Sequence, residues 1–407
     1  MLMDSQKCLI VMDDRGVISL GGDDVRDFLQ NLITQDIATL EPGHGAWAAL
    51  LSPQGKYLFD FFVVAMNDGS LMLDCEASRV SDLIARLETY KLRADVEITD
   101  ASTPWTVAAL LGTEADSRAL VGFEGRGGPF GGGVCYVDPR FGAIGARALL
   151  PRPALAALLG AGFEEQDRDA YDHARICLGL PDGARDLAID KALPLENGLD
   201  VLNAINWEKG CYVGQELTAR MRYRATVKRR LLPVAIEGDA PKPGTLIMLG
   251  DKEAGEMRSS FEDIGLALLR LDALATLHEK GGVLTAGDTT LSGTSLFVCA
   301  LVGLAVTGLL VWITEYYTST SFRPVKSVAK FPATAQPGLV AAERVFELLD
   351  TGLDATDRPN HLDSRIDQRL APFARGIEGQ LFDLIRHDLN SFRQDLDAPG
   401  FGKPRVS

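Results

Sequence analysis

The chain has 407 residues, enough for two or three domains, and a formal net charge of −15. That charge argues against a general nucleic-acid binder, so no direct DNA binding is predicted. The cysteines show neither a CxxC pair nor metal-ligand spacing, which favours a reducing compartment and argues against a private zinc or cluster site. They are Cys8, Cys75, Cys135, Cys177, Cys211 and Cys299. Residues 1–6 lack the features of a secretory signal, and we predict a cytoplasmic protein.

The first half of the chain alternates short apolar runs with turn residues. Residues 8–12 and 16–20 flank an Asp/Gly turn and predict a β-hairpin. Apolar side chains at helical spacing then predict a helix over 25–33. Two further runs, 46–51 and 57–65, flank a Pro/Gly turn and predict a second hairpin. The glycine-rich segment 122–133 lacks a phosphate-binding pattern and is expected to be a flexible turn.

Two aspartates fall inside apolar strands. Asp60 lies in the run 57–65, where a carboxylate is costly unless it is paired or faces a polar cavity. Because side chains alternate along a strand, an outward-facing Asp60 is the alternative. Asp74 ends the next predicted strand ahead of a helix over 78–90, and we interpret it as a structural cap or a ligand contact.

The most informative stretch is the octet K-G-C-Y-V-G-Q-E at 209–216. Its small residues let backbone approach a ligand or another chain closely. The downstream segment is basic, and nearby cations would hold a cysteine as thiolate. The pattern predicts an anionic, thiol-reactive or metal-bearing partner; the alternative is a cysteine that is simply buried. The residues concerned are Lys209, Gly210, Cys211, Tyr212, Gly214, Gln215, Glu216 and Arg220.

The octet matches K-G-C-[FY]-x-G-Q-E at every position and so resembles the YgfZ family, folate-binding relatives of the glycine-cleavage T-protein that take part in iron–sulfur cluster assembly. Residues 28–36 are similar to the same family's F-L-Q-x-L-x-T-x-D segment, and the resemblance covers about 8–291. It implies a tetrahydrofolate ligand and, as partners, iron–sulfur cluster assembly or client proteins, including tRNA-modifying iron–sulfur enzymes. The resemblance makes Cys211 the reactive centre beside Lys209, in an accessory factor with a transferase-like fold.

The resemblance also suggests residues that contact folate. They are Asp60, Asp74, Glu196 and Arg224. Asp60 follows Gly55 at the spacing at which the T-protein places an aspartate near the folate. The T-protein pattern R-[IL]-E-x-G supplies a glutamate to the pterin, but this chain has Cys177 there. A thiol cannot make a carboxylate's bidentate bond, which argues against the alternative function of a tetrahydrofolate-dependent aminomethyltransferase.

The implied fold is α+β, a T-protein-like ring of two α+β subdomains plus a small antiparallel β-barrel, followed by one hydrophobic helix and a helical tail. The expected domains are a folate-binding domain at 1–230, the barrel at 231–292, a transmembrane helix at 293–318, and a linker with amphipathic helices at 319–407.

Residues 295–314 are uncharged and long enough to cross a hydrocarbon core of ~30 Å as a helix. A buried core helix is the alternative. Residues 294–330 resemble one helix of the membrane proton-pumping pyrophosphatases, without the Asp-rich motifs that pump activity needs. A membrane contact through 295–314 would make the chain a membrane-anchored adaptor produced by a fusion, which is the third candidate function.

Overall fold

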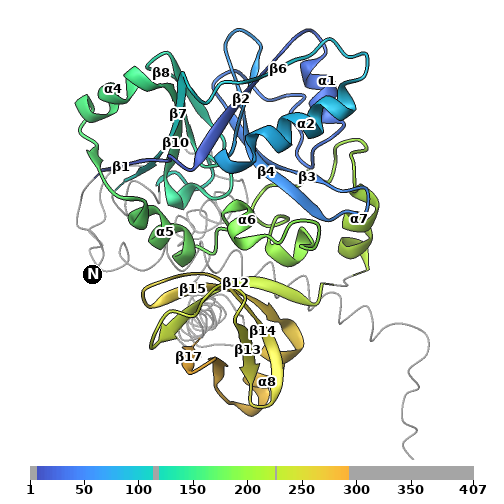
Figure 1. Ribbon diagram of the computed structural model, residues 1–407, viewed down its shortest axis with the longest axis vertical. Coiled ribbons are helices and arrows are strands. Elements are labelled where there is room, and N and C mark those ends of the chain that lie inside the picture. Colours follow the sequence, from blue (N-terminus) through green and yellow to red (C-terminus); the bar gives the residue numbers. More distant parts are fainter. Residues whose placement is uncertain (1–6, 113–118, 225–226, 293–407) are drawn as a thin grey trace, which may run out of the picture. The chain divides into compact units, whose positions relative to one another are not determined.

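The computed structural model describes residues 7–112, 119–224 and 227–292 (Figure 1). These residues form two β-sheets with flanking helices and a closed β-barrel, as the α+β prediction requires. No helix among the described ranges is long and apolar enough to span a membrane. The predicted hydrophobic helix at 295–314 and the tail at 319–407 lie outside the described residues.

The first sheet has five antiparallel strands in the order β3-β4-β5-β2-β6. Their bounds are β2 (Arg15–Gly21), β3 (Gly45–Leu51), β4 (Tyr57–Ala65), β5 (Leu71–Glu76) and β6 (Glu97–Asp100). Strands β3 and β4 pair directly, which confirms the second predicted hairpin. Helices α1 (Val25–Gln30) and α2 (Val80–Lys91) share a core with one face of this sheet. Because both faces of β3 and β4 are buried, these strands are apolar almost throughout.

The second sheet has six strands in the order β11-β1-β7-β10-β9-β8. Their bounds are β1 (Cys8–Val11), β7 (Trp105–Leu111), β8 (Gly127–Phe130), β9 (Gly133–Val137), β10 (Ala146–Pro151) and β11 (Glu164–Glu165). One face carries α4 (Leu155–Gly160). The other face shares a large core with the first sheet, to which Trp47, Phe62, Val107 and Leu149 contribute. The two sheets are therefore packed into one unit with this core between them.

Two local predictions were wrong. Strands β1 and β2 do not form a hairpin, because β1 pairs with β7 and β11 whereas β2 pairs with β5 and β6. Turn residues predict a reversal of the chain but not the partner of each strand, and both strands are buried inside different sheets. The glycine-rich segment is also not merely a turn, since β8 pairs with β9. A Cβ at Gly127 would lie 2.4 Å from the Cys135 carbonyl oxygen, so only glycine fits there.

Short helices lie in the connections between strands and between the sheets and the barrel. They are η1 (Ala77–Arg79), η2 (Gly142–Ile144), η3 (Arg152–Ala154), α5 (Arg168–Cys177), α6 (Gly183–Asp186), η4 (Leu195–Asn197) and α7 (Gln215–Tyr223). Helix α5 buries Tyr171, Asp172, Arg175 and Ile176. Three of these side chains are polar, so this helix brings charge as well as apolar surface into the interior.

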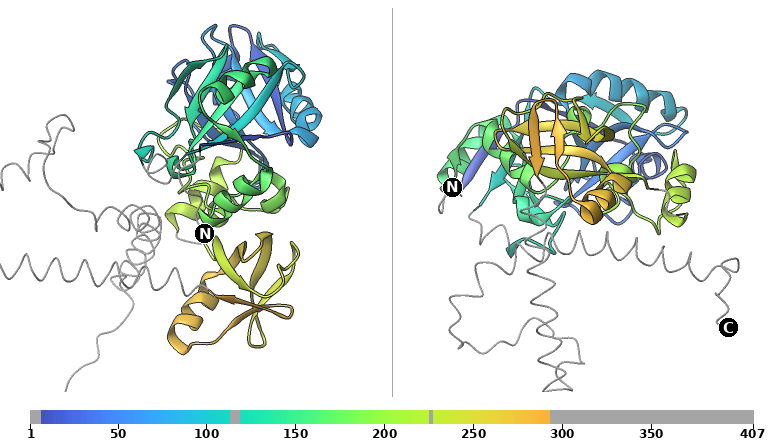
Figure 2. Two further views of the ribbon diagram at one scale, coloured as in Figure 1. Left: turned by 90° about the vertical axis from the view of Figure 1, so that its left-hand side faces the viewer. Right: turned by 90° about the horizontal axis from the view of Figure 1, so that it is seen from below.

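The barrel confirms the predicted antiparallel closure, with strand order β12-β15-β14-β13-β16-β17. The bounds are β12 (Arg229–Glu237), β13 (Leu246–Leu249), β14 (Lys252–Phe261), β15 (Ile264–Arg270), β16 (Leu284–Ala286) and β17 (Thr289–Ser292), with α8 (Leu271–Lys280) after β15. The right-hand view of Figure 2 shows these strands wrapping round one another. Closure leaves no free strand edge in the described barrel, and the interior is filled by Ile236, Met257, Ala267 and Leu269.

Candidate functional site

The octet rests on the segment that follows α1. Thr34 donates its hydroxyl hydrogen to the Ala204 carbonyl at 2.6 Å and accepts the Ala49 amide hydrogen at 2.9 Å. The Asn206 amide donates to the Thr34 carbonyl at 3.0 Å. Residues 28–36 and the approach to the octet, two segments that the sequence places far apart, are therefore one structural unit.

Lys209 anchors the start of the octet to that unit. Its ammonium donates to the backbone carbonyls of Gln30 at 2.7 Å, Ile33 at 2.8 Å and Gln35 at 2.7 Å. These carbonyls lie at and beyond the C-terminal end of α1, where a helix leaves acceptors unpaired. Burial lowers the pKa of Lys209 to about 8, against the opposing effect of Asp36. All three ammonium donors are used, so none is left for the Cys211 sulfur predicted beside it.

Gly214 anchors the other end of the octet. It has a φ of +83°, and a Cβ there would lie 2.6 Å from the Ser52 carbonyl oxygen. Gly55 approaches from the β3–β4 turn, where a Cβ would lie 2.9 Å from the Gly214 carbonyl oxygen. Helix α7 begins directly afterwards at Gln215. The small residues of the octet thus serve a close approach of two backbone segments.

Cys211 lies between these two anchors and is exposed. Cys8 and Cys75 are buried, and burial raises the pKa of the Cys75 thiol to about 12. A Cβ added at the neighbouring Gly210 would meet no atom within 4 Å, so the space beside that glycine is open. Tyr212, by contrast, is buried, and burial raises the pKa of its hydroxyl to about 12. The loop therefore holds an exposed thiol between two fixed ends.

The arginines after the octet do not converge on that sulfur. Arg220 pairs with Glu216 at 2.5 Å, and Arg222 lies over the Trp207 ring at 4.1 Å. Arg224 is exposed at the C-terminal end of α7. Among the described residues, no hydrogen bond joins a guanidinium to Cys211. Within the described part of the chain, these cations therefore make no direct contact of the kind that the sequence predicted would hold Cys211 as a thiolate.

Asp60 faces the shared core and not solvent, so the outward-facing alternative is wrong. Its carboxylate accepts hydrogen bonds from Trp47 Nε1 at 3.0 Å and from the Tyr57 hydroxyl at 2.7 Å. Burial and the neighbouring Asp60 raise the pKa of Tyr57 well above its usual range. The two donors satisfy a carboxylate that would otherwise be costly to bury.

Asp74 is fully buried, and it is the centre of an ion cluster and not a cap. Arg15 Nε lies 2.6 Å from one of its oxygens, and an Arg147 nitrogen lies 2.6 Å from the other. The Arg147 guanidinium also lies over the Phe62 ring at 3.9 Å. With both oxygens paired, Asp74 has a structural role that explains its burial, and the predicted folate contact is left without support.

The other two folate candidates lie elsewhere. Glu196 belongs to η4 and is half-buried, and burial raises the pKa of its carboxyl against the effect of Arg229. Arg224 caps the C-terminal end of α7. Asp60 and Asp74 both act on the buried Arg15, because, against the effect of burial, the charge of each carboxylate raises the pKa of that guanidinium. No contact among the described residues joins Glu196 or Arg224 to this pair of aspartates, so the four candidates are not brought together.

A charged cavity of about 290 Å³ opens next to the ion clusters. Its lining is Asp14, Arg15, Glu76, Ala77, Ser78, Asp182, Gly183 and Arg185. A Cβ at Gly183 would lie 3.2 Å from a Glu76 carboxylate oxygen and 3.6 Å from an Asp60 oxygen. The missing side chain therefore leaves room in front of two carboxylates. Sequence patterns indicated Asp60 but none of the lining residues, because their charges look like ordinary solvated positions.

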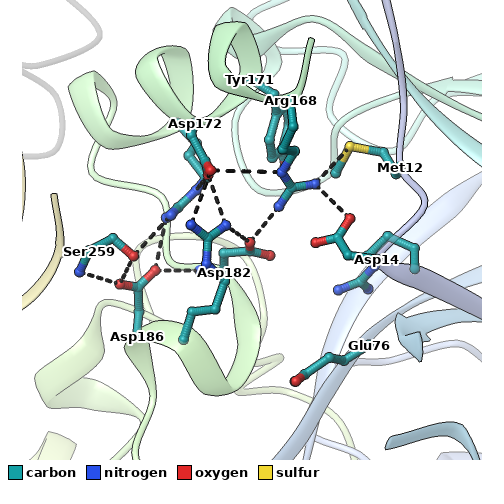
Figure 3. A network of polar contacts seen from close by, with 12 residues as sticks. Met12, Asp14, Glu76, Arg168, Tyr171, Asp172, Asp182, Asp186 and Ser259 are labelled. Carbon is teal, nitrogen blue, oxygen red and sulfur yellow. Dashed lines mark hydrogen bonds and ion pairs between the residues drawn. The ribbon is translucent and has the colours of Figure 1, made fainter. Parts of the chain in front are cut away.

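A network of polar contacts supports one wall of this cavity (Figure 3). Asp182 accepts from Arg168 at 2.6 Å and from Arg185 at 2.9 Å. Burial raises the pKa of Asp182, but the surrounding guanidinium groups, Arg175 foremost, outweigh burial and hold that pKa well below its usual range. Asp186 accepts from Arg175 at 2.8 Å and from the barrel residue Ser259 at 2.6 Å. The network thus ties α5 and α6 to the barrel.

The architecture and this site define the class: a T-protein-like fold with a small C-terminal barrel. Residues 6–121 match the family described as the GCVT N-terminal domain, and residues 228–295 match the CAF17 C-terminal beta-barrel domain. The glycine cleavage system aminomethyltransferase T from Bartonella henselae superposes with a TM-score of 0.57 at 16% identity, covering 70% of this chain and 84% of that one. At that identity the likeness shows the fold alone.

The relatives are more specific. Mitochondrial iron–sulfur cluster assembly factor IBA57 of Mus musculus is 32% identical over 289 residues, which span 66% of this chain and 79% of the mouse protein. The human protein is 29% identical over 275 residues, which span 63% of this chain and 76% of the human protein. The homologue from Mycosarcoma maydis is 31% identical, and the match spans 57% of this chain and 58% of that protein. The chain belongs to the IBA57 family of iron–sulfur cluster assembly factors.

Membership of the IBA57 family agrees with one of the two predicted resemblances and gives no support to the other. YgfZ, which the octet resembles, is a family related to the IBA57 proteins. The resemblance of 294–330 to a pyrophosphatase helix finds no support in the comparisons and concerns residues outside the described ranges.

Proposed function

We propose that this chain supports the assembly or repair of iron–sulfur clusters, including those of tRNA-modifying enzymes, with Cys211 as the reactive centre. One observation carries the proposal: Cys211 is exposed on a loop whose two ends are fixed by Lys209 and Gly214. Thiolates are the usual protein ligands of iron–sulfur clusters. A fixed, accessible thiolate can bind the iron of a cluster while a partner protein holds the rest, or it can attack the outer sulfur of a partner's persulfide, from which the partner's thiolate leaves.

Each neighbour of Cys211 then has a defined task. Lys209 positions the loop from inside, because its ammonium is bonded to three carbonyls. Gly210 leaves the approach to the sulfur free of side chains. The cluster is the substrate of this site and comes from an assembly protein or goes to a client protein. The IBA57 relatives are mitochondrial by name. For this chain we propose the cytoplasm, supported by Cys75, Cys135, Cys177 and Cys211, which form no disulfide within the described residues, as a reducing compartment requires.

A second part of the proposal concerns tetrahydrofolate. The donor set of the cavity supports such a ligand, because Glu76 and Arg185 line it and an Asp60 oxygen lies next to the lining residue Gly183. Carboxylates suit the N–H groups of a pterin, and guanidinium groups suit the glutamate tail. When bound, tetrahydrofolate carries a one-carbon unit. Calorimetric titration with tetrahydrofolate tests the assignment. In Gly183→Val the added side chain would fill the space in front of the two carboxylates, and binding of tetrahydrofolate should be lost.

Aminomethyl transfer remains less well supported. Cys177 ends α5 half-buried, and burial and the nearby Asp263 of the barrel raise the pKa of its thiol. It therefore lies near the barrel and offers no carboxylate to a pterin. A glycine-cleavage assay with tetrahydrofolate decides between the two functions. The membrane-anchored adaptor depends on residues outside the described ranges, and fractionation of the expressed chain between membrane and cytosol tests it.

The decisive experiment for Cys211 is complementation. In cells lacking the native protein, Cys211→Ala should fail to restore the activity of iron–sulfur enzymes, including those that methylthiolate tRNA. Cys177→Ala is the matched control, because it removes a half-buried thiol outside the octet, and it should restore activity. If Cys211→Ala restores full activity while folding normally, Cys211 is not the reactive centre.

A further inference from the structure

The segment that carries Cys211 has a charge opposite to that of the whole chain. Between residues 209 and 230 there are seven lysines and arginines and one glutamate, within a protein of net charge −15. A local excess of this kind produces a positive potential that the rest of the surface does not share. Whether these cations can meet a partner depends on the contacts that each makes within the chain.

Three of the seven cations are occupied by the fold. Lys209 is bonded to backbone carbonyls, Arg222 lies on the Trp207 ring, and Arg230 pairs with Asp200 at 2.8 Å. Among the residues that the structure describes, Arg220 bonds only to the exposed Glu216, an ion pair that water weakens. Three more are exposed and form no ion pair within the described part of the chain. They are Arg224, Lys228 and Arg229.

An aromatic side chain lies among the free cations. Tyr223 is 76% exposed, although a large ring gains free energy when it leaves water. Residues 216, 220, 223 and 224 recur at the spacing of one helix face, and the buried Thr218 and Met221 mark the opposite face of α7. Tyrosine and arginine are among the residue types that most often dominate the energy of protein interfaces. The outward face of α7 therefore has the composition of a docking site.

We propose that this face binds an acidic segment of a partner protein and so brings that partner to Cys211. We give the name Cys211 surface to the exposed side chains of this segment that carry the proposal: Cys211, Arg220, Tyr223, Arg224, Lys228 and Arg229. The proposal rests on the proposed function, because it names the kind of protein that exchanges a cluster or sulfur with the thiolate. Carboxylates on the partner would form ion pairs with Arg224, Lys228 and Arg229. The ring of Tyr223 would pack against the side chains that carry those carboxylates.

A protein fits the Cys211 surface better than a nucleic acid does. The chain as a whole is strongly negative and repels a long polyanion beyond the immediate contact. A short acidic segment needs only the few cations near α7, whereas nucleic-acid binders neutralise many phosphates.

The test uses the full-length chain and short synthetic peptides that differ in charge. Each peptide carries one cysteine activated as a pyridyl disulfide. The Cys211 thiolate attacks the peptide sulfur, a mixed disulfide forms, and the pyridyl sulfur leaves as pyridinethione, whose absorbance gives the rate. The rate of Cys211→Ser is subtracted as the background from other cysteines. At low salt the aspartate- and glutamate-rich peptide should react about tenfold faster than the lysine-rich one, and the ratio should fall toward one at high salt.

Neutral variants locate the effect. Arg224→Gln combined with Lys228→Gln and Arg229→Gln should remove most of the rate difference between the two peptides, and Tyr223→Ala should slow the acidic peptide alone. Arg93→Gln, an exposed arginine that follows α2, is the matched control and should leave the ratio unchanged.

Two results would overturn the proposal: equal rates for both peptides in the native chain, or a faster reaction with a single-stranded DNA activated in the same way. Neither result depends on complementation by Cys211→Ala. The function of Cys211 in cluster assembly and the charge of its partner are therefore tested separately.

Discussion

The molecule has two arginine-rich regions, and they differ in how their charge is balanced. In the interior, Arg15 and Arg147 share Asp74, and Arg140 pairs with Asp138 at 2.7 Å. On the surface, Arg224, Lys228 and Arg229 form no ion pair within the described residues. A buried charge must be neutralised where it stands, whereas water stabilises an exposed one. The interior arginines thus hold the fold together, and the surface ones remain available for binding.

We expect the largest effect on stability from removing one arginine of the interior ion cluster. Arg147→Met leaves one oxygen of the fully buried Asp74 without its partner, and we expect a loss of about 3–5 kcal/mol in the free energy of unfolding. Urea denaturation measures it. The exposed Arg93→Met should change stability by no more than about 0.5 kcal/mol. Equal stability of Arg147→Met and the native chain would show that the cluster is dispensable.

The next effect concerns the base of the Cys211 loop. Gly214→Ala places a Cβ 2.6 Å from the Ser52 carbonyl oxygen at a φ of +83°, and we expect a loss of about 3 kcal/mol. The octet offers its own control, because Gly210→Ala meets no atom within 4 Å and should be close to neutral in stability. If both variants unfold at the same urea concentration, the close approach of the two backbones is not a constraint.

Lys209→Met tests whether the lysine is an anchor. Three carbonyls lose a charged donor, and we expect a loss of about 2 kcal/mol in the free energy of unfolding near neutral pH. The pH dependence gives a second readout. Burial lowers the folded-state pKa to about 8 from 10.5, so between these values the unfolded chain binds more protons and stability rises with pH. Denaturation across this window should show the rise in the native chain and its loss in Lys209→Met.

We expect the smallest effect on stability from Asp182, which lines the cavity. Surrounding arginines outweigh burial and lower the folded-state pKa of Asp182, so the ionised carboxylate stabilises the fold at pH values above its ordinary 3.8. That stability is lost as pH falls through the lowered pKa. Between about pH 7 and about pH 3.5, the native chain should lose roughly 1 kcal/mol more than Asp182→Asn, measured by urea denaturation. An identical acid dependence of both proteins would contradict this role.

Some features followed from contiguous residues alone. The second hairpin needs only two apolar runs and the turn between them, and its pairing in β3 and β4 confirms the prediction. The octet indicated a group of proteins related to the IBA57 family, and that resemblance implied the small antiparallel barrel. For the hairpin the physical cause lies within a few residues along the chain, where spacing and turn chemistry act directly.

Other features were decided by tertiary structure. The partners of β1 and β2, the arginines that neutralise Asp74, and the carbonyls that receive Lys209 all lie outside the local segment. The cavity before Gly183 likewise joins residues from separate parts of the chain. A local sequence pattern indicates whether a charged residue or a strand is present. Its partner is determined only when distant segments pack together, because every buried polar group must then find a hydrogen-bond or ion-pair partner. Such partners become visible only once the chain is folded.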